Sequence, residues 1–290
     1  VDTLDLVEHE GRPALVVGYV EGASMNELRG NGPLAPAAVA RVGWQIASCL
    51  HALHEARDEA GVPLGVIHRD VSGGNILVDK SGDAVLIDLG IAKFDHGRSA
   101  HTETGAIVGT ARYLAPELLE EEAYAPASDL WALACVLAEA STGRPLFFGN
   151  TRESIARIAR FKGAHDLDLA GVDDGIARIL GRVLVRDPRA RAHAPEIVEL
   201  FRGREEALGG GRAALAARVT PQAVSSTIGA DVLFADVATA IDDTAGAANA
   251  GGASSVFTSS SSSSPSSPKP ALGLLRPLTN PSTSRAPPRR

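Results

Sequence analysis

The segment that decides the fold covers residues 66–78 and reads Val-Ile-His-Arg-Asp-Val-Ser-Gly-Gly-Asn-Ile-Leu-Val. It begins apolar, turns through a polar stretch that ends at Asn75, and becomes apolar again. This alternation predicts a short strand, a tight loop and a second short strand. The loop presents one carboxylate, Asp70, and one amide further along, Asn75.

A second carboxylate follows soon after this loop. The apolar run 84–87 leads directly into Asp88. Phosphoryl transfer needs a carboxylate that can accept a hydroxyl proton, together with an amide and a carboxylate that can hold Mg²⁺. Asp70, Asn75 and Asp88 are groups of these kinds, so the sequence points to phosphoryl-transfer chemistry.

Four motifs in this chain resemble those of protein kinases. Residues 68–75 resemble the kinase catalytic loop, and Asp88-Leu89-Gly90 resembles the metal-binding Asp-Phe-Gly motif. Ala115-Pro116-Glu117 lies downstream at a kinase-like distance and follows residues 109–114, Gly-Thr-Ala-Arg-Tyr-Leu. A lone His-Arg-Asp triplet is more simply a surface turn. Because all four motifs occur in order and at the right spacing, the chain is identified as a member of the protein kinase family.

The resemblance implies an α+β, protein-kinase-like fold, mainly the helical C-lobe with a partial N-lobe β-hairpin and a disordered tail. We expect partial N-lobe strands and the hinge at residues 1–22, and the C-lobe at residues 23–205. Residues 206–290 are expected to form a low-complexity tail rich in Ala, Gly, Ser and Pro, which includes the serine run 259–264. Only a weak helix at residues 212–217 and a short apolar patch at residues 232–234 are candidates for structure within it. Such a tail cannot bury enough apolar surface to offset the entropy of ordering.

Local patterns predict the individual elements. Residues 3–10 and 14–17 flank Gly11-Arg12-Pro13, which predicts a hairpin. Residues 36–56 carry apolar residues three or four apart, which predicts a long amphipathic helix. His51 and His54 lie on it, where packed or half-exposed histidines are much more common than metal ligands. Further helices are predicted at residues 24–28, 128–142, 151–160, 173–185 and 195–201.

The resemblance also implies a site for ATP and Mg²⁺. Asp70 would orient and deprotonate the substrate hydroxyl, while Asn75 and Asp88 would bind Mg²⁺ bridging the nucleotide phosphates. Ser72 stands where serine/threonine kinases usually carry a lysine that steadies the transferred phosphate, and Gly73-Gly74 replaces a Pro-containing turn. Serine can hydrogen-bond a phosphate but carries no charge, so this departure weakens transition-state stabilisation unless another group supplies it.

Adenine contacts are implied for the hinge-like segment and for the second strand of the loop. Val17 sits where the residue guarding the back of the adenine pocket belongs. The backbone from Gly18 through Tyr19 to Val20 would contact adenine, and Leu77 would pack beneath it. Taken alone, the hinge-like residues fit a strand that ends in a glycine turn equally well.

The hydroxyl-rich segment that follows Gly90 matches a kinase activation segment. Phosphate on Thr102 or Thr104 would pair with arginine, and Arg69 beside the expected base is one such arginine. Thr110 resembles the threonine that, in serine/threonine kinases, hydrogen-bonds near the catalytic Asp. The alternative is an ordinary solvated loop.

Four residues are expected to hold the domain together. Asp129 either caps the helix 128–142 or, by resemblance, is the buried Asp that holds the catalytic-loop backbone. Arg191 resembles a late kinase signature residue that pairs with Glu117, and losing one partner of such a buried pair would strand the other charge. His68 would pack against Leu89.

Composition limits the other classes of function. The chain has 290 residues, a net charge of −7 and a pI near 5.6, which argues against general nucleic-acid binding. Cys49 and Cys135 are expected to be buried apolar residues. No apolar run reaches the roughly 18 residues that a membrane span needs, so the expected location is cytoplasmic. The first residue is Val, which hints at a fragment or a processed form. The oligomeric state is left open.

Two departures from the kinase sequence pattern bear on catalytic activity. The chain has four lysines, Lys80, Lys93, Lys162 and Lys269, and no Gly-x-Gly-x-x-Gly precedes the hinge-like segment. The strand lysine and the glycine-rich loop of kinases are therefore not found before it. We expect ATP- and Mg²⁺-dependent phosphorylation of protein serine or threonine by a truncated or fragmentary kinase domain. The alternative is a catalytically inactive pseudokinase that acts as a binding or regulatory module.

Overall fold

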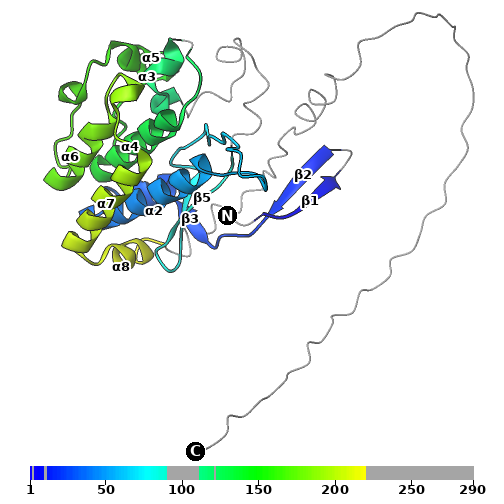
Figure 1. Ribbon diagram of the computed structural model, residues 1–290. Coiled ribbons are helices and arrows are strands. Elements are labelled where there is room, and N and C mark those ends of the chain that lie inside the picture. Colours follow the sequence, from blue (N-terminus) through cyan, green and yellow to red (C-terminus); the bar gives the residue numbers. More distant parts are fainter. Residues whose placement is uncertain (2, 10–11, 90–110, 121, 220–290) are drawn as a thin grey trace, which may run out of the picture. The chain divides into compact units, whose positions relative to one another are not determined.

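The computed structural model describes residues 1, 3–9, 12–89, 111–120 and 122–219 (Figure 1). The fold is α+β and mostly helical with small sheets, as the sequence predicts. The strands are β1 (Thr3–His9), β2 (Arg12–Val17), β3 (Gly22–Ser24), β4 (Ile76–Asp79) and β5 (Ala84–Leu86). The helices are α1 (Met25–Gly30), α2 (Pro36–His54), α3 (Pro116–Leu119), α4 (Pro126–Thr142), α5 (Thr151–Arg160), α6 (Asp174–Val183), α7 (Ala194–Leu208) and α8 (Gly211–Ala216). Short 3₁₀ turns are η3 (Ala111–Tyr113), η4 (Ala164–Asp166) and η5 (Pro188–Ala190).

The strands form two antiparallel sheets. β1 and β2 form the predicted hairpin, with Leu6 opposite Leu15. β3, β4 and β5 form the second sheet, in which Ser24 lies opposite Leu77. The strand predicted at the start of the 66–78 segment is wrong, because residues 66–67 join no ladder in the part of the chain that the structure describes. The segment instead runs without regular structure into the loop.

The core is organised around α4, which is buried from residue 128 to residue 140. A helix that is apolar on all sides belongs inside a protein, and α4 has helices on its flanks. Trp131, completely buried, stacks on Phe147 with ring centroids 5.9 Å apart and meets Phe161 edge-on at 5.1 Å. α2 packs against both α4 and α7 (Figure 1).

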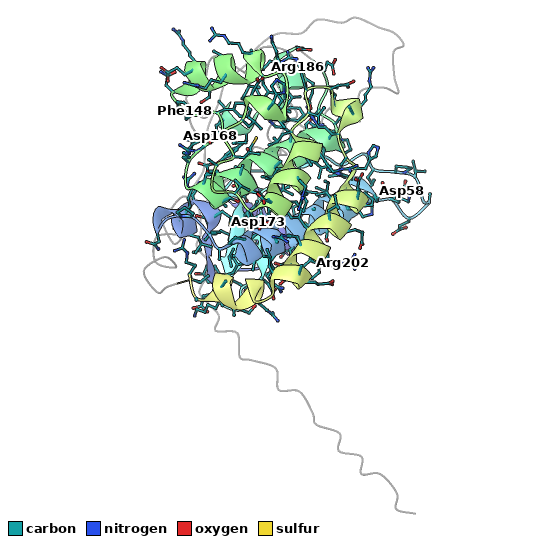
Figure 2. The ribbon with its side chains drawn as sticks, turned by 90° about the vertical axis from the view of Figure 1, so that its left-hand side faces the viewer. Asp58, Phe148, Asp168, Asp173, Arg186 and Arg202 are labelled. Carbon is teal, nitrogen blue, oxygen red and sulfur yellow. The ribbon has the colours of Figure 1, made fainter. Side chains whose placement is uncertain are left out.

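Close approach between α2 and α7 depends on a glycine. A Cβ on Gly43 would lie 2.8 Å from ring carbons of Phe201, a distance that real Cβ atoms do not show. Val39, Val42 and Ile46 of the same helix are completely buried, as its apolar spacing predicts. On the neighbouring helix α6, Asp173 is the N-cap and accepts hydrogen bonds from the amides of Gly175 and Ile176, both at 3.0 Å (Figure 2).

The C-terminal boundary differs from the predicted one. A tail beginning at residue 206 would start inside α7, which continues to Leu208. Gly209 and Gly210 then adopt positive φ angles of 66° and 75°, a conformation that favours glycine, and the chain turns into α8. Leu215 of α8 is completely buried. Helical structure therefore continues past the expected boundary, and residues 220–290 of the expected tail lie outside the described residues.

α8 is attached to the rest of the fold by arginines. Arg212 donates to the backbone oxygen of Ser81 at 3.1 Å and pairs with Asp83, both in the turn between β4 and β5. Arg218 donates to the backbone oxygen of Pro33 at 2.9 Å. Composition alone did not reveal this docking, because the contacts join segments distant in the sequence. Within the described ranges, every helix is too short or too polar to cross a membrane.

Candidate active site

The catalytic-loop backbone is held from α4 by Asp129. Its Oδ2 accepts a hydrogen bond from the His68 amide at 2.8 Å, and its Oδ1 accepts one from the Arg69 amide at 2.9 Å. Arg69 has a φ of +64°, which is unfavourable for a residue with a Cβ, so the two bonds stabilise a strained turn. The N-cap of α4 is Ala125, so Asp129 does not occupy the capping position and its carboxylate instead binds the loop.

A third donor to this carboxylate comes from α2. His54 Nε2 lies 2.8 Å from Asp129 Oδ2, and the two side chains are 5% and 2% exposed. Since an ionised carboxylate can only accept, Nε2 carries the hydrogen in this contact. The sequence placed His54 on a helix, but its periodicity gave no sign of a partner on α4. His54 is thus a residue of the site that the sequence analysis missed.

His68 connects the loop with the strand that leads to Asp88. It is 2% exposed, and its Nε2 lies 3.1 Å from the backbone oxygen of Ile87. Burial lowers the pKa of His68, which favours the neutral ring with Nε2 donating to Ile87. The expected contact partner, Leu89, is 42% exposed.

Asn75 and Asp70 form a bridged pair across the loop. The Asn75 amide nitrogen donates to the backbone oxygen of Asp70 at 2.9 Å and to its Oδ2 at 3.2 Å. The backbone oxygen of Asn75 accepts from the Ile87 amide at 2.9 Å, and Ile87 immediately precedes Asp88. This backbone hydrogen bond places Asp88 beside the catalytic loop, where a carboxylate ligand for Mg²⁺ is expected.

The donor set fits a divalent cation. Partial burial raises the pKa of Asp88, and the neighbouring negative charge of Asp70 raises it further. Two carboxylates that repel each other, beside an amide whose oxygen faces no donor among the described residues, would be stabilised by a bound cation. Asp88 also has a φ of +56°, a second strained residue in the same site.

Residues expected to contact adenine differ in exposure. Leu77 in the middle of β4 is only 6% exposed, whereas Val17 and Tyr19 are 42% and 69% exposed. Gly18 and Val20 are half-buried. Leu77 is thus packed within the sheet, and the adenine contacts stay a prediction.

The expected activation residues Thr102, Thr104 and Thr110 lie outside the described residues. Arg69, their expected partner, places its guanidinium 5.7 Å from the centroid of the Tyr124 ring. This cation–π contact holds the guanidinium beside Tyr124.

Glu117 and Arg191 form a bidentate pair in the core. Arg191 donates to the two carboxylate oxygens at 2.7 and 2.6 Å, and the side chains are 0% and 2% exposed for the arginine and the glutamate. Arg191 also donates to the backbone oxygens of Val185, Arg186 and Ala127. Burial raises the pKa of Glu117, but the hydrogen bonds and charge of Arg191 outweigh it, so the pKa is lowered.

A second buried carboxylate lies near the loop and was not predicted. Glu139 of α4 is 2% exposed and accepts from the Tyr113 hydroxyl at 2.6 Å. Burial raises the pKa of Tyr113, so the hydroxyl keeps its proton. Arg29 and Arg112 both pair with the same glutamate, the latter at 3.3 Å. Glu139 is thereby charge-compensated within the fold.

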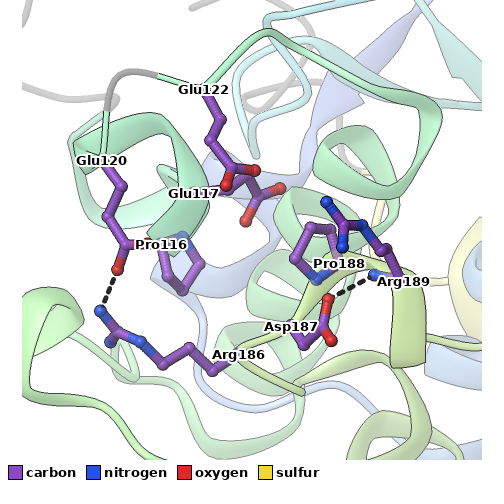
Figure 3. A pocket seen from close by; sticks show the side chains of 8 residues that line it. All are labelled: Pro116, Glu117, Glu120, Glu122, Arg186, Asp187, Pro188 and Arg189. Atoms are coloured by element: carbon purple, nitrogen blue, oxygen red, sulfur yellow. Dashed lines mark hydrogen bonds and ion pairs between the residues drawn. The ribbon is translucent and has the colours of Figure 1, made fainter.

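One pocket among the described residues is lined by no residue of the catalytic loop. It has a volume of about 380 Å³ and lies between α3 and the segment 186–189 (Figure 3). Its wall carries an ion pair between Glu120 and Arg186, and Asp187 accepts a hydrogen bond from the Arg189 amide at 2.9 Å. Neither Asp70 nor Asn75 lines this pocket, so we do not assign the phosphoryl-transfer chemistry to it.

Comparison with known proteins identifies the family to which this chain belongs. The family model described as "Protein kinase domain" matches residues 1–200. This chain therefore belongs to the protein kinase family, and it is homologous to bacterial serine/threonine protein kinases. It is 36% identical over 147 residues to the serine/threonine-protein kinase PknB of Mycolicibacterium smegmatis, 50% of this chain and 22% of that protein. It is also 36% identical over 146 residues to a probable serine/threonine-protein kinase of Corynebacterium efficiens, 50% of this chain and 21% of the other.

A third relative is a probable PknB of Bifidobacterium longum, 34% identical over 149 residues, which are 51% of this chain and 20% of that protein. The matched part thus spans about a fifth of the length of these curated relatives.

Proposed function

We propose that this chain carries the phosphoryl-transfer site of a serine/threonine protein kinase, with ATP and Mg²⁺ as cofactors and protein serine or threonine as acceptor. Family membership and the printed names of its relatives support the reaction class. The observation that carries the proposal is the bridged pair in which the Asn75 amide donates to Asp70 while Asp129 fixes the loop backbone.

Each side chain has a definite task in this proposal. Asp70 accepts the proton of the acceptor hydroxyl and orients its oxygen toward the phosphoryl group. Asn75 fixes the Asp70 carboxylate through its amide nitrogen, which leaves its oxygen for the metal. Asp88 supplies the carboxylate ligand. Mg²⁺, when bound, would neutralise charge on the nucleotide phosphates.

Ser72 is the residue at which stabilisation of the transferred phosphoryl group is weakest. It occupies the position of the usual lysine and offers only a neutral hydroxyl to the transferred phosphoryl group. A neutral donor stabilises developing negative charge less than a cation does. We therefore expect slow turnover, and Ser72→Lys to increase the rate of phosphoryl transfer.

The first experiment measures binding of a fluorescent ATP analogue with and without Mg²⁺. Asp88→Asn should abolish the Mg²⁺-dependent part of the affinity, whereas Asp70→Asn should keep nucleotide binding and abolish transfer to a protein acceptor. Asp168→Asn is the matched control, because this exposed carboxylate pairs with Arg144 and accepts from the Ala170 amide on the surface. Mg²⁺-independent binding in the wild-type chain would contradict the proposal.

A second candidate function is a binding module without catalysis. It is favoured by Ser72, which offers no positive charge to the transferred phosphoryl group. The retained set Asp70, Asn75 and Asp88 speaks against it, because a binding module has no need of a complete metal-ligand set. Nucleotide binding with no phosphorylated product, in the presence of diverse protein acceptors, would favour this candidate.

A further inference from the structure

α8 holds the turn of the β4–β5 hairpin, at the end opposite the catalytic loop. Arg212 donates to the backbone oxygen of Ser81 at 3.1 Å and to its hydroxyl at 3.3 Å, and it pairs with Asp83. Gly82 in the same turn has a φ of +83°, and a Cβ there would overlap the backbone oxygen of Arg212 and lie 3.0 Å from the Ala216 nitrogen. The backbone of α8 therefore lies directly against the turn.

The same helix also holds the loop that follows α1. Arg218, two residues beyond the end of α8, donates to the backbone oxygens of residues 31, 32 and 33 at 3.0, 2.6 and 2.9 Å. These residues connect α1 with α2. Leu215, between the two arginines, is completely buried, and α8 packs along α2 (Figure 1). A buried apolar side chain with an arginine on either side thus fixes the position of α8.

Both segments that α8 holds lead to the candidate active site. The β4–β5 hairpin starts after Asn75, and the hydrogen bond from the Ile87 amide to the Asn75 oxygen, at 2.9 Å, closes its other end directly before Asp88. α1 is joined to the catalytic loop by its Asn26 amide, which donates to the backbone oxygen of Gly73 at 3.1 Å. α8 therefore connects the hairpin that carries the expected metal ligands with the helix that contacts the loop.

The hairpin is short and regular, so a shift at its turn is transmitted to its other end. Ile76 lies opposite Leu86 in the antiparallel ladder, and ladder hydrogen bonds fix the spacing of the two strands. Arg41 of α2 also donates to the backbone oxygen of Gly82, at 3.1 Å. Loss of the α8 contacts would therefore loosen the turn without freeing it, and the expected effect at the site is moderate.

We propose that α8 positions the metal ligands, with Arg212 and Arg218 as positioning residues, so that docking of α8 raises the affinity of the site for Mg²⁺ with nucleotide. The inference rests on the proposed kinase function. Mg²⁺ demands near-ideal octahedral geometry, whereas Ca²⁺ accepts a flexible one. A loosened hairpin would let Asn75 and Asp88 move apart, so Mg²⁺ loses more affinity than Ca²⁺ when α8 is detached.

The test compares two metals on the full chain. A fluorescent ATP analogue is titrated at saturating Mg²⁺ and at saturating Ca²⁺, and anisotropy gives the two dissociation constants. Arg212→Ala and Arg218→Ala should each weaken Mg²⁺-dependent binding about twofold to tenfold and Ca²⁺-dependent binding less than about twofold. Partial unfolding lowers the amplitude of both titrations equally, so a change in the ratio of the two constants reports the geometry of the site.

One control and one rescue variant make the test specific. Arg182→Ala is the control, because Arg182 pairs with Glu196 on the surface and is 57% exposed, while Arg212 is 56% exposed. It should leave the ratio of the two constants unchanged. Arg212→Lys retains the charge opposite Asp83 but loses the planar fork, so it should recover part of the Mg²⁺ affinity. The two alanine variants act on one helix, so their double variant should lose less than the product of the single effects.

Hydrogen exchange tests the positioning without nucleotide. Arg212→Ala should speed exchange of the Ile87 amide, measured by mass spectrometry on a peptide covering residues 84–89, and Arg182→Ala should not. If the wild-type chain binds Mg²⁺-nucleotide but the arginine variants match Arg182→Ala in both measurements, this inference is overturned and the proposed function stands. If the wild-type chain binds no Mg²⁺-nucleotide, the proposed function fails and the claim on metal affinity fails with it. Faster exchange at Ile87 would then still show that α8 holds the hairpin, and unchanged exchange would overturn that as well.

Discussion

His54 of α2 and Asp129 of α4 meet at 2.8 Å with both side chains almost fully buried. The same carboxylate accepts the amides of His68 and Arg69. One carboxylate therefore receives donors from a helix and from the catalytic loop, and the geometry of the loop depends on the rotamer that His54 helps to fix. Removing a donor from such a group leaves part of a buried charge unsatisfied.

We predict that His54→Ala raises the hydrogen-exchange rate of the His68 and Arg69 amides and lowers the free energy of unfolding by about 1–3 kcal/mol. His54→Gln, whose amide can donate from a similar position, should restore most of the protection. Mass-spectrometric exchange of a peptide covering residues 66–75 measures the effect. His51→Ala is the control, because His51 lies on the same helix and is half-buried. Equal exchange in the two alanine variants would contradict the prediction.

Arg191 and Glu117 lead to a second prediction. Arg191→Met should lower the free energy of unfolding by about 3–5 kcal/mol, because it leaves the Glu117 carboxylate buried without its partner. Adding Glu117→Gln removes the stranded charge, so the double variant should recover part of the loss. Urea unfolding followed by circular dichroism measures both. A double variant that loses the sum of the two single effects would show that the pair does not act as a unit.

Much of this architecture could be predicted because it is encoded locally. Alternation and turn residues predicted the hairpin of β1 and β2, apolar periodicity predicted α2, and an almost continuously apolar stretch predicted α4. The order of the motifs placed Asp70 and Asn75 on one loop and Asp88 directly after the apolar run 84–87. The structure shows how the last two are joined, through the hydrogen bond from the Ile87 amide to Asn75.

What could not be predicted depends on contacts between distant segments. The sequence predicts His54 to be an ordinary helix histidine, because its partner Asp129 lies on another helix. The sequence indicates only a weak helix at residues 212–217, within a tail that its Gly- and Ala-rich composition predicts to be disordered, and it gives no sign that this helix docks. Its order comes from Arg212 docking on the turn at Ser81 and from burial of Leu215. Neither contact leaves a periodic signal in the sequence.

The packing of α2 on α7 gives a third prediction, in which two effects of one substitution oppose each other. Gly43→Ala should raise helix propensity by about 1 kcal/mol. Its Cβ would lie 2.8 Å from the Phe201 ring, which is 1% exposed and has no room to move. Overpacking of this kind costs about 1–3 kcal/mol, so we expect net destabilisation.

Gly203→Ala on α7 is the matched control for this substitution. A Cβ there would meet nothing within 4 Å, so only the gain in helix propensity remains. Thermal unfolding should therefore move in opposite directions for the two variants. Stabilisation by both would show that the two helices lie further apart than the structure indicates.

The last prediction concerns Asp83 and the attachment of α8. Asp83 accepts from Arg41 at 2.6 Å and from Gln45 at 2.9 Å, and it pairs with Arg212. Burial raises the pKa of Asp83, but these hydrogen bonds together lower it to about 2. An aspartate in the unfolded chain has a pKa of about 3.9. The folded state thus binds fewer protons between these values, and the stability that Asp83 contributes is present above about pH 4 and is lost as the pH falls toward 2.

Asp83→Asn should therefore lower the free energy of unfolding at pH 7 by about 1–3 kcal/mol, and the difference from the wild-type chain should shrink between pH 4 and pH 2. Urea unfolding at pH 7, 4 and 3 measures it. Asp168→Asn removes a carboxylate whose ion pair with Arg144 is exposed, so it should change stability by less than about 1 kcal/mol at each pH. A difference for Asp83→Asn that stays constant down to pH 3 would mean that the Arg41 and Arg212 contacts do not depend on the charge of Asp83. The docking of α8 would then rest on Leu215 and the backbone contacts of Arg212 and Arg218.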